Sequence, residues 1–393
     1  MLVCPIEIYM TKTEKYDPCN NYYEYACNKD APDGDVFEEM AKQNSLKVIK
    51  VLNQGNTPNS SFWLRYSRQF WSRCLWEKRL KLLSTTRKET FNNPEEICFK
   101  EMTRRKEFWN SINRIFLDQT LPNIDDKRAE FVDDVSLITA NILTALKERI
   151  SSMAWISEEA QDALFAKIAA VEVITVYIDE IEEDRFIDEQ FFKAHPFQTP
   201  LIIDSLAPFN YQTNGGIFPL GMLQPPIFGS EDTPETYGRL AFLIAQFLGH
   251  PINNVAIRDG DSYRVYWNYT TEFDTVFNCF KEQYHRFDGY SEKFTEENIA
   301  DFIGLSAAYT AFNKEIKPQD DQIRLRKQFF RSFTKLFCST SSTKPGYSRQ
   351  TAPYLYRVMG ALQNMPEFSD TFSCKEGDKY FKKDRCDLWN LKL

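Results

Sequence analysis

The stretch YGRLAFLIAQFLGHPIN, residues 237–253, sets a glutamine and a histidine at helical spacing inside an apolar run. Its periodicity predicts a helix over residues 236–250, and Pro251 favours an end close to His250. Gln246 and His250 are four residues apart, so their side chains share one face of this helix. His250 is then either a hydrogen-bonded histidine of an ordinary core helix or the remainder of a metal-binding pair.

The composition is that of a folded protein with an acidic surface. Of its 393 residues, 42% are hydrophobic and 15% aromatic, which is ample for a sizeable core. The net charge of −8 and the pI near 5.3 argue against nucleic acid as the main partner, which would favour a basic face. No run of 18 apolar residues occurs, so we expect no transmembrane segment, and the start MLVCPIEIYM does not resemble a signal peptide.

The cysteines favour an oxidising compartment. No two of them form a CxxC pair, so a zinc ribbon is not indicated, and several lie near the two ends of the chain. Two glycosylation sequons, NSS at Asn59 and NYT at Asn268, add weakly to this interpretation. The cysteines are Cys4, Cys19, Cys27, Cys74, Cys98, Cys279, Cys338, Cys374 and Cys386.

Most of the chain has helical periodicity. The segment SEEAQDALFAKIAAV opens with Ser157 as an N-cap, followed by acidic first-turn residues. Residues 171–180 predict either a strand or a buried turn, and residues 210–228 an extended segment or edge strand with a Pro-Pro break. The protein is thus predicted to be mainly α with a small β component. Further helices are expected over residues 36–52, 61–86, 100–118, 126–150, 186–206, 294–316 and 324–337.

Five motifs together resemble one protein family. In residues, order and spacing they are similar to signatures of the neprilysin and endothelin-converting-enzyme family of zinc endopeptidases. The resemblance covers both ends of the chain and most of residues 125–393. The motifs are PCNNYYEYAC (18–27), FPLGMLQPPIF (218–228), ENIADFIGLSAAYTAF (297–312), TAPYLYRVMGALQNMPEFSDTFSC (351–374) and the final CDLW (386–389).

The resemblance implies a fold and a location. The expected fold is a thermolysin-like catalytic-domain scaffold, mainly α with a small β-sheet (α+β). Residues 125–393 would form a degenerate peptidase domain whose tail is disulfide-linked to the N-terminus. Residues 1–124 would form an N-terminal segment and a shortened helical region, with most of the family's covering helical lobe missing. Together with the cysteines, the family also implies an extracellular or cell-surface protein.

The motifs further imply how the cysteines pair. Cys4 is left without a partner, because Tyr9 stands where the family has a second cysteine. The implied disulfides are Cys19–Cys374, Cys27–Cys338, Cys279–Cys386 and Cys74–Cys98.

The family's zinc motif, H-E-x-x-H, belongs in the opening stretch. Its two histidines lie on one helix face and bind zinc, and its glutamate takes the proton from zinc-bound water. Here Gln246 stands at the first histidine and Phe247 at the glutamate, whereas His250 keeps the second histidine. Glu297 aligns with the third ligand. The family uses zinc, but the residual pair His250 and Glu297 is an insufficient site, so we predict no bound zinc.

Other positions of the family's site are changed or retained. Thr351 replaces the histidine that steadies the oxyanion, and Leu206 replaces a substrate-binding asparagine, for which Asn210 would substitute only with a local shift. Asp301, which orients a ligand histidine, and Arg357 are retained. Glu297 and Asp301 are either a solvated helix face or buried polar residues inherited from a site. Arg357 is more simply a core ion-pair partner, with Asp301 as the candidate, than a substrate-binding group.

Three functions remain open. The leading one is a catalytically inactive family member that binds a peptide or secreted protein outside the cell. The alternative is a zinc metalloendopeptidase that processes small secreted peptides, against which the sequence AQFLGH stands. The third is a drifting fragment without a stable function.

Overall fold

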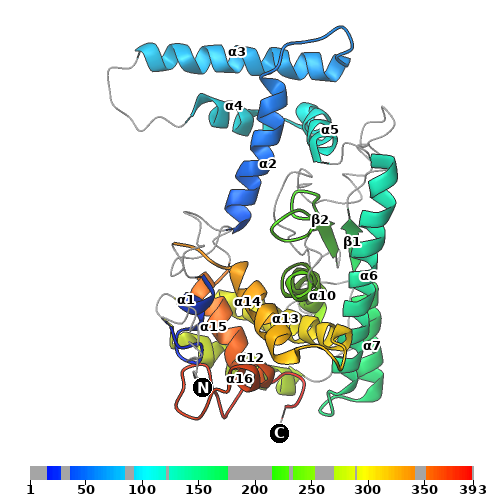
Figure 1. Cartoon of the computed structure of the whole chain (residues 1–393), viewed down its shortest axis with the longest axis vertical. Coiled ribbons are helices and arrows are strands. Elements are labelled where there is room, and N and C mark those ends of the chain that lie inside the picture. The colour runs from blue at the N-terminus through cyan, green and yellow to red at the C-terminus, as the bar shows by residue number, and fades with distance from the viewer. Residues whose placement is uncertain are drawn as a thin grey trace, which may run out of the picture.

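The computed structural model describes residues 16–27, 36–84, 93–120, 124–175, 215–229, 233–252, 270–287, 290–340 and 351–391. Its helices form two groups, seen at opposite ends of the molecule in Figure 1. The smaller group is built from α2 to α5, and the larger surrounds α13 (Thr295–Glu315). Each group has its own cluster of buried apolar side chains. No helix of the described residues is long and apolar enough to cross a membrane.

The larger group contains elements from both ends of the chain. It includes the π-helical turn η2 (Tyr237–Ala241) and the 3-10 turns η3 (His250–Ile252) and η4 (Glu292–Phe294). Its helices are α1 (Tyr22–Cys27), α6 (Ile124–Ser151), α7 (Glu158–Ala169), α9 (Thr233–Thr236), α10 (Phe242–Gly249), α12 (Thr270–His285), α13, α14 (Gln322–Lys335), α15 (Tyr354–Gln363) and α16 (Pro366–Phe372).

The smaller group packs around a separate apolar cluster. Its elements are α2 (Val36–Leu52), α3 (Phe62–Ser84), α4 (Pro94–Thr103), the 3-10 turn η1 (Lys106–Phe108) and α5 (Trp109–Thr120). Helix α2 joins the two groups, because Phe37 and Met40 lie in the larger cluster and Val48 and Leu52 in the smaller one.

The prediction of a mainly α protein is confirmed, and several boundaries agree closely. Helix α2 has the predicted bounds, and the Ser157 side chain accepts a hydrogen bond from the Ala160 N–H at the start of α7. Strand β1 (Glu172–Thr175) pairs in parallel with β2 (Gly215–Phe218), with Glu172 opposite Gly215. These are the only strands among the described residues. The predicted helix over 186–206 lies outside the described residues.

One helix prediction was wrong, and one helix was not predicted. The single helix expected over 100–118 is interrupted: α4 ends at Thr103, Arg105 is extended, and the Trp109 indole donates to the Thr103 carbonyl at 2.7 Å. The break turns both Met102 and Phe108 into the smaller cluster. Helix α12 was not predicted, although Phe273, Val276 and Phe280 have helical spacing and are buried.

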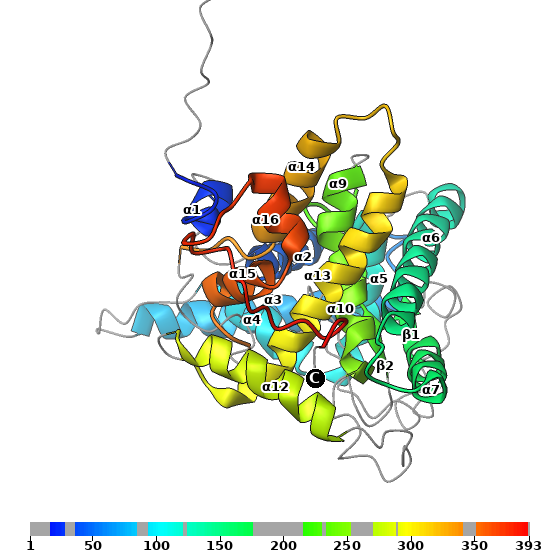
Figure 2. The ribbon, with the colours of Figure 1, turned by 90° about the horizontal axis from the view of Figure 1, so that it is seen from below.

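Helix α13 is the centre of the larger group. Fifteen of its 21 residues are buried, as expected for a helix covered on every side. In Figure 2 it runs beside α10, with α6 on the far side of α10. Its small residues allow this closeness. A Cβ on Gly304 would lie 2.7 Å from the N, Cα and Cβ atoms of Gln246, and one on Gly249 would lie 2.6 Å from Ile303 Cγ2.

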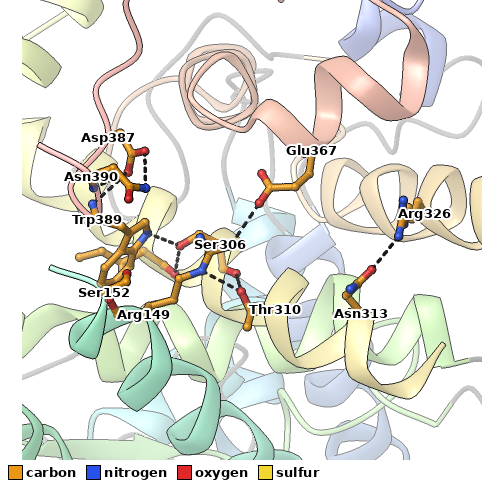
Figure 3. A network of polar contacts seen from close by, with 11 residues as sticks. Arg149, Ser152, Ser306, Thr310, Asn313, Arg326, Glu367, Asp387, Trp389 and Asn390 are labelled. Carbon is orange, nitrogen blue, oxygen red and sulfur yellow. Dashed lines mark hydrogen bonds and ion pairs between the residues drawn. The ribbon is translucent and has the colours of Figure 1, made fainter. Parts of the chain in front are cut away.

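Polar contacts hold the second half of α13 (Figure 3). The Trp389 indole donates to Ser306 Oγ at 2.9 Å, which ties the chain's CDLW segment to this helix. Arg149 of α6 donates to Thr310 Oγ1 at 2.8 Å and pairs with Glu367 of α16 at 3.2 Å. Three elements distant in sequence therefore fix the position of α13.

Four disulfides close the fold, and the implied pairing is confirmed. Two of them join α1 and the residues before it to the C-terminal part of the chain, over sequence separations of 355 and 311 residues. A loop of this size, taken alone, corresponds to about 6 kcal/mol in the chain-entropy account. The predicted lone Cys4 lies outside the described residues. The bonds are Cys19–Cys374, Cys27–Cys338, Cys74–Cys98 and Cys279–Cys386.

We predict that Gly304→Ala destabilises the protein. Helix propensity alone favours alanine over glycine by about 1 kcal/mol. At Gly304 the added methyl meets the Gln246 backbone, and overpacking of this kind costs about 1–3 kcal/mol. Urea unfolding followed by circular dichroism measures the change. Gly55→Ala is the matched control, because no atom lies within 4 Å of its Cβ position, and its effect should stay within about 0.5 kcal/mol. Stabilisation by Gly304→Ala would contradict the packing argument.

Candidate functional site

The predicted site residues of α10 and α13 lie close together. Gln246 of α10 and His250, the first residue of η3, both face α13, and Glu297 lies opposite them in the first turn of α13. Gln246 Nε2 lies 2.8 Å from Glu297 Oε2, and His250 Nε2 lies 3.8 Å from Glu297 Oε1. The sequence thus correctly predicted which residues meet at this point.

In the hydrogen bond between Gln246 and Glu297, the glutamine is the donor. An ionised carboxylate only accepts hydrogen bonds, so the glutamine directs its NH₂ group toward Glu297. One carboxylate oxygen of the predicted third ligand is therefore occupied by a donor. The Gln246 NH₂ group stands where a metal-binding histidine nitrogen would be. It donates a hydrogen bond to Glu297 and has no lone pair with which to bind a metal.

His250 sits in an environment that favours its neutral form. Its side chain is 4% exposed. Burial lowers the pKa of His250, the Glu297 carboxylate opposes this, and the Arg357 guanidinium lowers the pKa further. The 3.8 Å contact with Glu297 is accordingly not a strong ion pair at neutral pH. His250 is thus a buried histidine at the end of α10.

Phe247 fills the position of the family's catalytic glutamate. It is 1% exposed and packs edge-to-face against Phe218 of β2, with ring centroids 4.9 Å apart. The ring belongs to the large apolar cluster. No proton acceptor exists on this side chain, and a carboxylate here would be buried against an aromatic ring.

These residues do not fit a zinc ion. Zinc sites in proteins use about four ligands, three or four of them from the protein, drawn from imidazole, thiolate and carboxylate groups. His250 and Glu297 supply one imidazole and one carboxylate, and in the described part of the chain no third such side chain joins them. Another cluster of potential ligands combines Cys19, Cys374 and Asp378, but the two sulfurs are joined in a disulfide.

Asp301 and Arg357 form a buried ion pair. Arg357 Nε and Nη2 donate to the two carboxylate oxygens of Asp301 at 2.7 and 2.5 Å. Asp301 is fully buried and Arg357 is 9% exposed, and the guanidinium also lies over the Phe337 ring. Burial raises the pKa of Asp301 to about 6, and Arg357 limits the rise. The expected core ion pair is therefore present.

Several polar groups near this pair were not predicted. Tyr284 of α12 is fully buried, and its hydroxyl has no hydrogen-bond partner among the described residues. Its ring occupies the space beside Gly360, whose Cβ would lie 2.1 Å from Tyr284 Cζ. Asn298, next to Glu297, is also fully buried, and neither side-chain amide atom has a hydrogen-bond partner within the described part of the chain. The spacing of Phe273, Val276, Phe280 and Tyr284 was the signal for α12.

The remaining predicted positions divide into two sets. Thr351 is partly buried just before α15, and Asn59 is exposed in the loop between α2 and α3. Leu206, Asn210 and Asn268 lie outside the described residues. The segment 218–228 follows β2 and is largely buried, with Leu220 in the smaller cluster and Leu223 in the larger.

Comparison with known proteins agrees with the family resemblance of the sequence motifs. Residues 207–388 match peptidase family M13. Over 320 residues the chain is 24% identical to human endothelin-converting enzyme 1, covering 67% of this chain and 41% of the relative. Neprilysin-3 of Drosophila melanogaster is 27% identical over 229 residues, which are 52% of this chain and 28% of the relative.

The chain is therefore a homologue of the neprilysin and endothelin-converting-enzyme family of metallopeptidases. Solved structures share its fold. The zinc metalloprotease Zmp1 of Mycobacterium tuberculosis in complex with an inhibitor aligns with TM-score 0.63 at 16% identity, covering 84% of this chain and 57% of that one. A Haemonchus galactose-containing glycoprotein complex aligns with TM-score 0.59 at 18% identity, over 76% and 55% of the two chains. This neprilysin homologue spans about two fifths of the length of the endothelin-converting enzymes that it matches.

We predict that Arg357→Met destabilises this neprilysin homologue by about 3–5 kcal/mol, because it leaves the Asp301 charge buried without its partner. The loss should depend on pH. Without Arg357, the folded protein takes up a proton at Asp301 more readily than the unfolded chain does. Stability is then retained in acid and falls as the pH rises through the raised pKa of the carboxyl.

Urea unfolding at pH 5 and pH 8 measures both effects. Arg114→Met is the matched control, because Arg114 is exposed and pairs with Asp118 on the surface of α5, and its effect should stay within about 0.5 kcal/mol. Equal destabilisation by the two variants, or a larger loss for Arg357→Met in acid than in base, would contradict a buried ion pair.

Proposed function

We propose that the chain is a catalytically inactive member of the neprilysin family, which binds a peptide or a secreted protein outside the cell. The observation that carries this proposal is the Gln246–Glu297 hydrogen bond beside a buried Phe247. Gln246 stands at the position of a zinc ligand, and Phe247 stands at the position of the general base. General acid–base assistance is worth about 10²–10⁴ in rate, and no neighbouring described side chain replaces it.

We also propose that the protein binds no zinc at physiological zinc concentrations. One imidazole and one carboxylate form too small a donor set, and the carboxylate already accepts a hydrogen bond from Gln246. The remaining function is then recognition. A fold whose relatives are peptidases offers a surface shaped for peptides, and this support is an analogy of fold rather than a property of the site.

The proposed location outside the cell rests on the four disulfides. Such bonds persist in oxidising compartments and are rare in the cytosol. The exposed Asn59 in an NSS sequon is a candidate glycosylation site there.

A second candidate function is a working zinc metalloendopeptidase that processes small secreted peptides. One observation favours it: His250 and Glu297 are still adjacent, at 3.8 Å. A metal assay separates the two functions. Protein purified without chelators is analysed by mass spectrometry for zinc, before and after His250→Ala. We expect substoichiometric zinc that His250→Ala does not change. Stoichiometric zinc that His250→Ala removes, or peptide hydrolysis that a chelator abolishes, would overturn the inactive interpretation.

We predict that Gln246→His creates the missing ligand. It places a second imidazole four residues before His250 and opposite Glu297, so zinc affinity should rise by more than about tenfold. Isothermal titration with zinc measures this gain, and His250→Ala in the same background is the control that should remove it. The variant should remain a poor peptidase, because Phe247 still supplies no base. Peptide hydrolysis by Gln246→His would contradict the role assigned to position 247.

A further inference from the structure

Helix α3 has two apolar faces: one packs into the smaller cluster, and the other is largely exposed, although its Tyr66 ring stacks on Phe108 at 5.4 Å. Its inner face places Trp71, Cys74 and Leu75 in the smaller cluster. In Figure 1, α3 lies at the end of the molecule with α2, α4 and α5 on one side and no described element on the other. Of the eight exposed large apolar side chains in the described part of the chain, five belong to α3.

The exposed residues follow a regular spacing. Successive steps of four, three, four, three and four residues define a continuous stripe along the outer face, which we call the outer seam. Phe62 and Trp76 are 63% and 64% exposed, and Tyr66 and Leu80 are 42% and 44% exposed. This spacing is the one with which a helix packs against another helix. The outer seam consists of Phe62, Tyr66, Gln69, Arg73, Trp76 and Leu80.

A cavity deepens one end of the outer seam. It has a volume of about 480 Å³ and lies between α3 and the loop that precedes it. The stacked rings of Phe62 and Tyr66 form part of its wall. Arg68 lies at its base, 6% exposed, and donates to the carbonyls of Val51 and Gly55. No carboxylate among the described residues pairs with this buried cation, and none lines the cavity.

The positive charge of α3 favours an acidic partner. The helix carries six basic residues and one acidic residue, within a chain of net charge −8. Arg65 and Arg68 line the cavity, and Arg73 lies within the outer seam. A partner with acidic side chains beside an apolar stripe would complement both properties. A second copy of this chain would instead bring two basic helices together.

A lipid surface fits the outer seam less well than a helix does. Gln69 and Arg73 divide the apolar residues into one cluster around Phe62 and another around Trp76. A partner helix can place polar side chains opposite this division, whereas a bilayer interior cannot. The cavity is also concave, which suits a protruding side chain.

We propose that the outer seam of α3 docks an acidic amphipathic helix of a partner protein. The partner lays its apolar stripe along Phe62, Tyr66, Trp76 and Leu80, inserts one side chain into the cavity, and places carboxylates near Arg65 and Arg73. This surface uses no residue of the Gln246–His250 site. Its test therefore succeeds or fails independently of the proposed loss of zinc chemistry.

A pair of synthetic helical peptides tests the proposal on the full chain. Both carry leucines at alternating steps of three and four residues, and their flanking positions are all glutamate in one and all lysine in the other. Fluorescence anisotropy of the labelled peptides measures binding. We expect the glutamate peptide to bind at least about tenfold more tightly than the lysine peptide, with an affinity that falls as salt increases.

Variants locate the binding surface. Trp76→Ser with Leu80→Ser should weaken the glutamate peptide at least about tenfold, given the weight of buried aromatic anchors. The matched control replaces Leu137 and Ile323, which are 62% and 51% exposed on α6 and α14, by serine and should leave binding unchanged. Arg65→Glu with Arg73→Glu should reverse the preference toward the lysine peptide. Circular dichroism checks that each variant is folded.

Three results would overturn the proposal. One is equal affinity for the two peptides, or binding that the Trp76 and Leu80 variant does not change. Another is a concentration-dependent dimer, measured by sedimentation, that this variant dissolves while neither peptide binds; the seam would then join two copies. The last is binding to phosphatidylserine-containing vesicles without binding to the glutamate peptide.

Discussion

The contact between α10 and α13 is the constraint on which the rest of the structure depends. Glycines at 249 and 304 let the two helices approach until the Gln246 backbone lies beside Gly304. At that distance, any side chain at 246 or 250 that faces α13 must interact with its first turn. Gln246 satisfies this condition by donating to Glu297, and His250 does so as a neutral buried ring. The same geometry that would bring ligands to a metal here brings a hydrogen-bond donor to an acceptor.

The side chains around this contact make ordinary core interactions, including those at positions that align with the family's catalytic residues. Arg357 donates two hydrogen bonds to Asp301. The buried carboxylate is therefore compensated by the guanidinium and needs no histidine partner. Phe247 joins the apolar cluster through Phe218, so the position that aligns with the family's catalytic glutamate is part of the core. Each of these positions makes an ordinary packing or hydrogen-bonding interaction, so the proposed loss of chemistry is compatible with the stability of the fold.

How much the sequence predicted depends on the range of the interactions involved. Local signals were reliable: the periodicity of α2, the Ser157 cap and the motifs that carry the cysteine pairing all agree with the structure. The partners of Gln246 and Glu297 followed from the family motif, but the direction of their hydrogen bond required coordinates. The break at Arg105 was missed because both flanking segments are helical, and only their shared core shows why the chain turns there. The free outer face of α3 was equally invisible, since exposure depends on neighbours remote in sequence.

The disulfides Cys19–Cys374 and Cys27–Cys338 have a topological consequence. Together with the backbone, the Cys19–Cys374 bond closes residues 19–374 into a covalent ring, and Cys27–Cys338 closes a second ring within it. A single peptide bond cut anywhere between Cys27 and Cys338 opens this ring without dividing the molecule. Fragments produced by one such cut would remain attached and would separate only after reduction. For a protein proposed to work outside the cell, a nicked chain can thus keep the contact between α1 and α14 in place.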